Sequence, residues 1–192
     1  MCSFVATNVH HLGSRTKTMK LKNQKRYFIN VSLLLIVVGL LFSSCTKPEI
    51  YPNTPVIKYK SFEKIPTTTG IDNKGYLTIS FTDGDGDVGL KPEDTLPPYN
   101  LGSKYYYNFF IDYYEQQGDT FVKIDLPITN NSRIPYIEPN LAEFGIKGEI
   151  EIEIYFNNIM SNSDSIKYEM YIVDRALNKS NVVMTPAIYV KK

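Results

Sequence analysis

Three aspartates alternate with two glycines in the stretch FTDGDGDVGL, which covers residues 81–90. Asp83, Asp85 and Asp87 are two residues apart, so their carboxylates follow one another along a short loop. Ca²⁺ binds about six to eight oxygen atoms, mostly from carboxylates and carbonyls. The stretch therefore predicts a calcium-binding loop. The alternative is a tight turn whose aspartates face water, because Asp-Gly pairs are common turn formers.

The spacing of these aspartates matches only part of an EF-hand loop. Asp83, Asp85 and Asp87 occupy its first three ligand positions and Asp94 its twelfth. However, Val88 stands where that loop needs its sharp-turn glycine, and the twelfth ligand is usually a longer, bidentate Glu. No helical pattern flanks the stretch. These departures argue against an EF-hand and leave a looser calcium site as the prediction.

Residues for nucleophilic or zinc chemistry are confined to the beginning of the chain. The two histidines are His10 and His11, and the two cysteines are Cys2 and Cys45. Ser–His pairs, Cys–His pairs and the usual zinc sites are therefore excluded after Cys45. Paired carboxylates of a hydrolase remain, but the glutamates of GEIEIEIYF (148–156) have the spacing of a solvated strand face. We expect a protein that is not an enzyme.

Tyrosine is abundant after Cys45, with 14 of the 15 tyrosines of the chain. Tyr99, Tyr105 and Tyr106 lie in or beside the long loop 83–103 that follows the aspartates. Tyrosine rings in such loops can stack on sugars, so these three residues are candidate glycan-binding residues. The alternative is that the tyrosines belong to a strand, because aromatic residues favour pleated surfaces.

Residues 19–44 have the layout of a secretory signal. Four basic residues within 20–26 precede an apolar stretch from Phe28 to Phe42, which is shorter than the roughly 18–20 residues that span a bilayer. Two serines then lead to Cys45. Residues 1–18 lack periodicity and precede the better start at Met19, so we interpret them as a mis-assigned start.

The junction before Cys45 resembles the lipobox of bacterial lipoproteins, in which the cysteine becomes the first mature residue and carries lipid. Phe42 and Ser44 stand where that family usually has Leu and Gly or Ala, and lipoproteins of the Bacteroidetes type tolerate both. The resemblance implies a lipid anchor at Cys45 and a place at the outer membrane of the cell envelope. The alternative is an uncleaved anchor helix. Residues 46–55 contain three prolines, so 45–55 is predicted to be the lipidated cysteine and an extended tether.

The charge is unevenly distributed along the chain. Residues 1–44 contain six of the 21 basic residues and no acidic residue, so the remainder has 15 basic and 20 acidic residues and a net charge of −5. Nucleic-acid binding needs clustered Lys and Arg, and this acidic remainder has no basic run. We therefore expect no nucleic-acid partner.

Period-two alternation of apolar and polar residues predicts strands from residue 56 to the end. The candidate strands are 56–62, 75–81, 104–116, 120–126, 148–156, 165–174 and 181–190. Gln117-Gly118-Asp119 predicts a hairpin turn, and LAEF (141–144) a single helical turn. This pattern favours one all-β domain over 56–192, folded as a β-sandwich.

The end of the chain, YEMYIVDRALNKSNVVMTPAIYV (168–190), resembles the last hairpin of bacterial Ig-like and fibronectin type III-like domains. Asp174 and Asn178 hold the places of its Asp-x-x-x-Asn turn, followed by Thr185 and Pro186, while Leu177 stands where Gly is usual. The FxDGDGDxG loop also resembles loops of uncharacterised Bacteroidetes surface lipoproteins. The resemblance implies a single Ig-like antiparallel β-sandwich of about seven to eight strands. In that fold the aspartate loop and Asp174 would share one end, so Asp174 is a fourth candidate calcium ligand.

Together these features predict a lipid-anchored, non-catalytic binding or structural module of the cell envelope. Its partners would be the membrane, through the anchor, and a glycan or another envelope protein. A glycan-binding accessory lipoprotein of a polysaccharide-uptake system is the main alternative, and a carboxylate-based hydrolase is the third.

Overall fold

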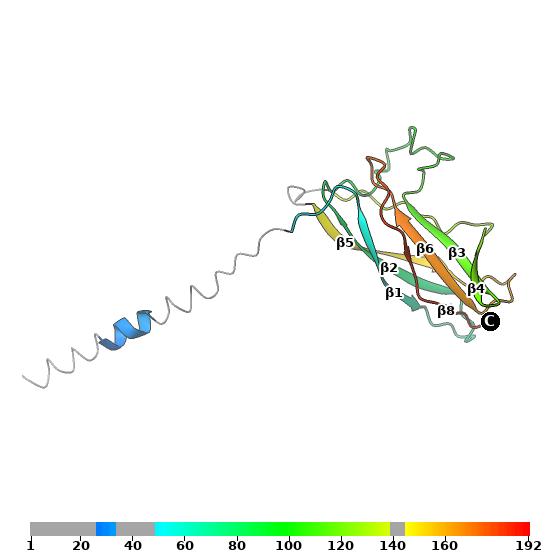
Figure 1. The fold of residues 1–192 in the computed structure, drawn as a ribbon, viewed down its shortest axis with the longest axis horizontal. Helices are drawn as coiled ribbons and strands as arrows, with labels where there is room; N and C mark the ends of the chain where they lie inside the picture. Colours follow the sequence, from blue (N-terminus) through cyan, green and yellow to red (C-terminus); the bar gives the residue numbers. More distant parts are fainter. Residues whose placement is uncertain (1–25, 34–48, 139–144) are drawn as a thin grey trace, which may run out of the picture. The chain divides into compact units, whose positions relative to one another are not determined.

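A computed structural model describes residues 26–33, 49–138 and 145–192 (Figure 1). The chain divides into two units, Met1–Lys47 and Pro48–Lys192. In the first unit residues 26–33 form an exposed helix, and no helix in the described part of the chain is long and apolar enough to cross a bilayer. Cys45 and the expected helical turn at 141–144 lie outside the described residues.

The second unit is all-β, as predicted, and the eight strands within its described residues form two antiparallel sheets. The strands are β1 (Val56–Lys64), β2 (Lys74–Asp83), β3 (Phe109–Gln117), β4 (Thr120–Ile124), β5 (Ile146–Tyr155), β6 (Ser165–Ile172), β7 (Val183–Met184) and β8 (Ile188–Tyr189). One sheet has the order β1-β2-β5. The other has the order β4-β3-β6-β7, and β8 also pairs with β6.

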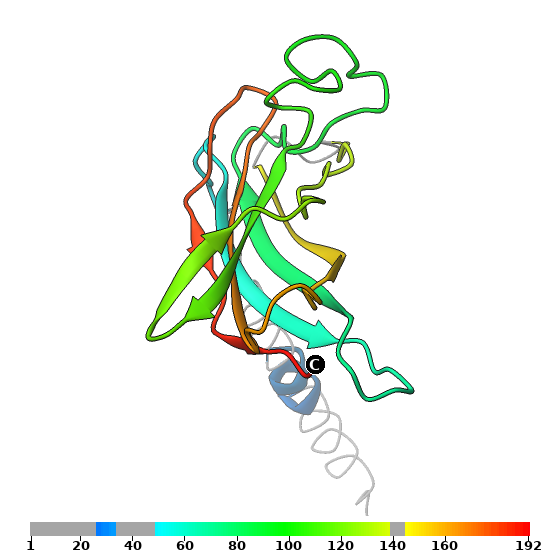
Figure 2. The same ribbon diagram turned by 90° about the vertical axis from the view of Figure 1, so that its right-hand side faces the viewer.

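This strand order is that of an Ig-like sandwich. The first, second and fifth strands form one sheet, and the third, sixth and last strands lie in the other, with β4 added beside β3. In Figure 2 the β3–β4 hairpin of one sheet and strands β2 and β5 of the other lie in separate layers. The predicted hairpin turn is present, because Gln117 pairs with Thr120 across it.

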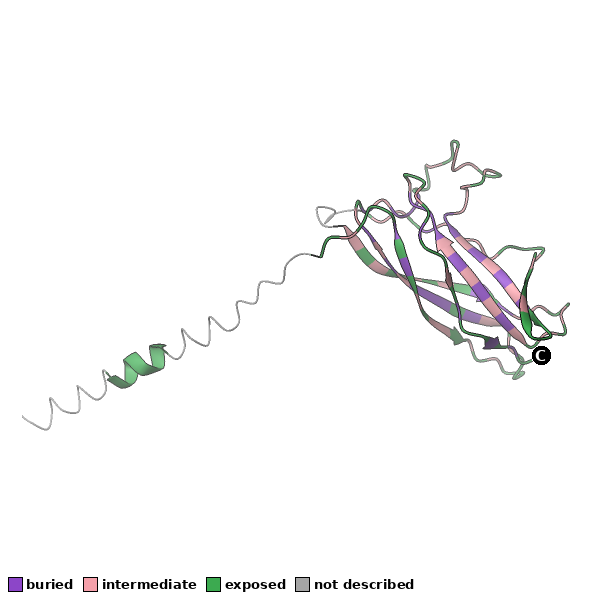
Figure 3. Cartoon of the chain, in the orientation of Figure 1, coloured by how far each residue is buried: buried purple, intermediate pink, exposed green. Residues whose placement is uncertain are grey.

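The core is built from the inward-facing residues of the strands, along which buried and more exposed residues alternate (Figure 3). Its fully buried side chains include Leu77 and Ile79 of β2 and the four expected residues of β6, namely Ile166, Tyr168, Met170 and Ile172. On β5 the glutamates face solvent and the isoleucines face inward, as predicted. The core residues in the described part of the chain lie between Ile57 and Val190, so Pro48–Lys192 contains its own core and is expected to fold by itself.

The predicted strand 104–116 is wrong at its beginning, because β3 starts only at Phe109. The Tyr106 carbonyl accepts a hydrogen bond from the Arg133 side chain (2.9 Å) instead of one from a neighbouring strand. The Asn108 side chain accepts another from the Ile134 amide (2.6 Å). Residues 104–108 therefore belong to the long loop before β3.

The predicted closing strand 181–190 is also divided, into β7 and β8. Thr185, between them, bonds Tyr168 of β6 twice: its amide donates to the Tyr168 carbonyl (2.9 Å), and its Oγ1 accepts from the Tyr168 amide (3.1 Å). Pro186 follows and has no N–H to continue the ladder. The two short strands result from this interruption.

Candidate metal site

Asp83 and Asp174 continue the inward-facing rows of two strands that belong to opposite sheets. On β2 the buried Leu77, Ile79 and Phe81 are followed at the next inward position by Asp83. On β6 the inward row that ends at Ile172 is followed in the same way by Asp174. Both carboxyl groups are buried, so two acidic side chains close one end of the core.

The glycines of the aspartate loop are required by the backbone. A Cβ added to Gly84 would lie 2.3 Å from the carbonyl oxygen of Tyr51, and the Gly84 amide donates to the Pro52 carbonyl (2.8 Å). Gly86 has φ of 70°, which L side chains rarely adopt. The segment at Tyr51–Pro52, which we expected in an extended tether, thus lies against this loop.

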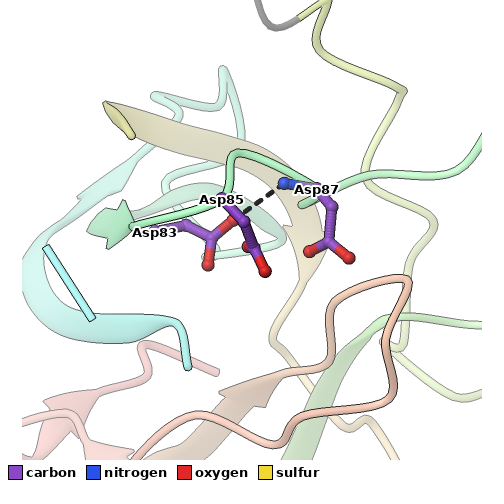
Figure 4. Close-up of side chains that lie close together, drawn as sticks. All are labelled: Asp83, Asp85 and Asp87. Carbon is purple, nitrogen blue, oxygen red and sulfur yellow. Dashed lines mark hydrogen bonds between the residues drawn. The ribbon is translucent and has the colours of Figure 1, made fainter. Parts of the chain in front are cut away.

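The loop brings three carboxylates together. One oxygen each of Asp83, Asp85 and Asp87 lies within 4.8 Å of the other two, and in Figure 4 the three carboxylates point to the same side of the loop. Asp83 is buried, Asp87 is partly buried and Asp85 is exposed. The site therefore has a buried floor and an open side through which an ion can enter.

Two oxygens of this cluster have no hydrogen-bond donor within the described residues. Asp83 uses Oδ2 to accept from the Asp87 amide (2.9 Å), and Asp87 uses Oδ2 to accept from the Ala176 amide (3.0 Å). Oδ1 of Asp83 and Oδ1 of Asp87 are buried and unpaired. A buried polar atom without a partner is costly, and a carboxylate oxygen can be satisfied by a cation.

The electrostatics of the cluster oppose full ionisation without a cation. Burial, with the nearby Asp85 and Asp87 carboxylates, raises the pKa of Asp83 to about 7. Burial and the Asp174 and Asp85 carboxylates raise the pKa of Asp87 to about 6. Burial also raises the pKa of Asp174. A divalent cation among these groups would stabilise their ionised forms.

The Asp174 carboxylate lies close enough to the aspartate loop to raise the pKa of Asp83 and of Asp87. This agrees with the expectation that Asp174 and the loop share one end of the sandwich. However, both of its oxygens already accept hydrogen bonds from Asn178. Oδ1 accepts from the Asn178 amide (2.7 Å) and Oδ2 from its side-chain nitrogen (2.8 Å). Asp174 is also not part of the set of three whose oxygens converge. Its contacts are those of a residue that fixes the 174–178 turn beside the site.

The spacing of the three oxygens suits Ca²⁺. Ca–O distances of about 2.3–2.6 Å allow two ligands of one ion to be about 5 Å apart. The three oxygens lie within 4.8 Å of one another, so one Ca²⁺ could contact all of them. Asp94, at the twelfth EF-hand position, binds the Arg175 guanidinium through both oxygens, so an EF-hand is not formed.

The long loop between β2 and β3, which contains the candidate tyrosines, is held at the same end of the sandwich as the aspartates by two arginines. The sequence did not predict a role for either arginine. The Arg133 guanidinium donates to four carbonyls, those of Lys91, Asp94, Tyr99 and Tyr106. Arg175 binds Asp94, and its carbonyl accepts from the Tyr99 hydroxyl (2.5 Å). Arg133 had no sequence signal because its partners are main-chain carbonyls, and Arg175 had none because its partner Asp94 is 81 residues away.

The candidate tyrosines separate in the structure. Tyr99 and Tyr106 line one cleft of about 360 Å³ together with Arg133, whereas Tyr105 is not among its lining residues. Instead, the Tyr105 ring lies under the ammonium group of Lys104, at 4.8 Å.

Comparisons with protein-family models, curated proteins and solved structures find no match to this chain. What the site binds is therefore inferred from its own atoms.

Proposed function

We propose that this protein is a lipid-anchored, non-catalytic module of the cell envelope whose loop at Asp83–Asp87 binds Ca²⁺. The observation that supports metal binding most directly is that Oδ1 of Asp83 has no hydrogen-bond donor among the described residues. This side chain is 0% exposed, and two further carboxylates lie within 4.8 Å of it. A buried, ionised carboxylate among like charges is unfavourable unless an opposite charge is present.

Bound Ca²⁺ would hold three parts of the chain together. The aspartate loop bonds Pro52 through the Gly84 amide. On its other side, the Asp87 carbonyl accepts from the Arg175 amide (3.3 Å) and the Asp87 carboxylate from the Ala176 amide. An ion that removes the repulsion within the loop therefore stabilises the entry segment and the 174–178 turn as well. The role is structural, because it stiffens one end of a binding module.

Thermal unfolding of Pro48–Lys192 in EDTA and then in excess CaCl₂ tests this function. A ligand that binds only the folded state stabilises it by about 2.7 kcal/mol at a hundred times its Kd, which is a shift of several degrees for a domain of this size. The rise should vanish in the double variant Asp85→Asn, Asp87→Asn. The matched control, Asp119→Asn with Asp125→Asn, should keep it. Identical curves in EDTA and calcium would show that the loop is only a turn.

Glycan binding is a second candidate, supported by the cleft of Tyr99 and Tyr106. The Tyr99 hydroxyl and the Arg133 guanidinium already have protein partners, so a sugar would contact mainly ring faces. An array of polysaccharides probed with the wild type and with Tyr106→Ala tests it. Binding that the substitution weakens would support the accessory role, and binding to no glycan would reject it.

A further inference from the structure

A cavity of about 440 Å³ lies at the end of β5 away from the aspartate loop. β5 begins at Ile146, which pairs with Asp83, and ends at Tyr155, which pairs with Lys74. The cavity walls are mainly apolar or aromatic, with Tyr113, Leu126, Ile128, Phe156 and Ile159 among them. None of the described residues that line it is charged. A ligand that enters this cavity must therefore be neutral and largely apolar.

One wall of the cavity is fixed by a buried carboxylate. Glu115 accepts hydrogen bonds from the Tyr113 hydroxyl (3.0 Å), the Asn158 side chain (2.9 Å) and Ser161 Oγ (2.6 Å). Tyr113 and Asn158 line the cavity, so these bonds hold its strand wall and its loop wall at a set distance. The cavity is thus formed before any ligand arrives.

Two residues of the cavity lining each have a buried side-chain amide atom with no partner among the described residues. Asn157 donates its Nδ2 to the Asp72 carbonyl (2.7 Å), which fixes the orientation of its amide and leaves the buried Oδ1 unpaired. Asn130 has a buried Nδ2 without an acceptor. These two lining residues therefore carry one acceptor and one donor that no described residue satisfies. A peptide group, with one N–H and one C=O, has the complementary pair.

The mouth of the cavity adjoins an open sheet edge and an exposed apolar rim. Ile128 and Ile159 are 83% and 87% exposed, and the adjacent Met160 is 90% exposed, which is typical of an interaction surface. β5 is the last strand of its sheet. Because the Phe156 amide donates to Asn73 on the β2 side, the main-chain groups of Tyr155, one residue earlier, point outward.

We propose that this end of the sandwich binds an extended, uncharged peptide segment of another protein. An apolar side chain of the peptide fills the cavity, its peptide groups bond Asn130 and Asn157, and its main chain pairs with the outer edge of β5 near Tyr155. A second copy of this chain is a poor occupant, because antiparallel pairing of β5 with itself would place the glutamates of the two copies opposite each other. The proposal does not depend on the metal site.

Isothermal titration of Pro48–Lys192 with a blocked Thr-Leu-Thr-Leu-Thr peptide tests this proposal, with Thr-Lys-Thr-Lys-Thr as the comparison peptide. We expect saturable binding of the first peptide and at least tenfold weaker binding of the second. Ile128→Lys, at the exposed rim, should weaken binding at least tenfold. Ile50→Lys, at an equally exposed isoleucine outside the cavity, should change it less than twofold. Unchanged melting temperatures would show that both variants fold.

Pairing with β5 is tested by Glu153→Pro, which removes an outward N–H, against Glu153→Thr, which keeps it. Weaker binding only in the proline variant supports strand pairing, and equal binding in both contradicts it. Diacetylchitobiose and phosphatidylcholine vesicles are titrated in parallel. If either binds at the Ile128 rim and the leucine peptide does not, the cavity is a sugar or lipid site and the proposal is wrong. It is also wrong if no probe binds at millimolar concentration.

Discussion

The carboxyl group of Asp83 makes the stability of the domain depend on pH. Its pKa in the folded protein is about 7, against an ordinary value of 3.8. Between these values the unfolded chain releases the proton and the folded protein keeps it, so the free energy of unfolding falls as pH rises. The fall is at most about 1.4 kcal/mol per pH unit for each such carboxyl. We expect urea unfolding in EDTA to show it between about pH 4 and 7.

Substitution of Asp83 separates this contribution from the rest of the protein. Asp83→Asn should flatten the pH dependence and should make the domain more stable than the wild type in EDTA near pH 7.5. Asp119→Asn, in the exposed hairpin turn, should leave the slope unchanged. In excess CaCl₂ the wild-type slope should shrink or reverse, because the metal favours the ionised carboxylates. If the free energy of unfolding of the wild type in EDTA rose with pH over this range, that would contradict a buried, neutral Asp83.

Leu177 adopts a conformation that suits glycine. Its φ is 68°, in the left-handed region that costs an L residue about 1–2 kcal/mol. It occupies the place where the turns it resembles usually have Gly. We expect Leu177→Gly to raise the free energy of unfolding by about 1 kcal/mol, measured by urea denaturation. Ala176→Gly, at the neighbouring residue without positive φ, should lower it, and a Leu177→Gly domain no more stable than the wild type would refute the prediction.

At the scale of elements, Arg133 holds the loop between β2 and β3 by donating hydrogen bonds to carbonyls in the earlier and the later part of that loop. Lys91 and Asp94 lie in its first part, and Tyr99 and Tyr106 further on. Lysine keeps the charge but lacks the planar fork that reaches several acceptors. Each lost bond is worth about 1 kcal/mol, so Arg133→Lys should increase the rate of chymotrypsin cleavage within 91–107 about tenfold.

The control for this loop is Lys104→Ala, which removes an exposed lysine of the same segment whose ammonium group lies over the Tyr105 ring. Its cleavage rate should stay within about twofold of the wild type, as expected of a surface change. If Arg133→Lys were cleaved no faster than Lys104→Ala, the loop would be held by other contacts, such as the Asp94–Arg175 pair.

The strands that the sequence predicted correctly are those in which apolar and polar residues alternate. β2, β5 and β6 each show apolar residues at every second position, so their inward faces were predictable, and the position of Asp83 follows from the same period. The start of β3 was not predictable. The tyrosines just before it favour a strand, but the Tyr106 carbonyl accepts a hydrogen bond from Arg133, which is 27 residues away in the sequence. The ion pair that removes Asp94 from the metal site joins residues 81 positions apart.

At the scale of the whole domain, the metal site and the apolar cavity lie at opposite ends of β5. The entry segment at Pro52 lies against the aspartate loop, whereas the apolar cavity lies beyond the other end of the strand. A metal that stiffens the entry end and a peptide that binds the far end would act on separate surfaces. Loss of calcium binding should therefore leave peptide binding intact.

Anchoring of the whole chain depends on Cys45 in our proposal. Expressed in a bacterial host fed an alkyne fatty acid, the wild type should be labelled and should sediment with membranes. Cys45→Ser should lose the label, because the sulfur that carries the lipid is gone. Cys2→Ser should be labelled like the wild type, because Cys2 precedes the signal segment. Stable anchoring needs more than one acyl chain. Labelling that survives Cys45→Ser would contradict the lipoprotein assignment, and an unlabelled wild type that still sediments with membranes would favour an uncleaved anchor helix.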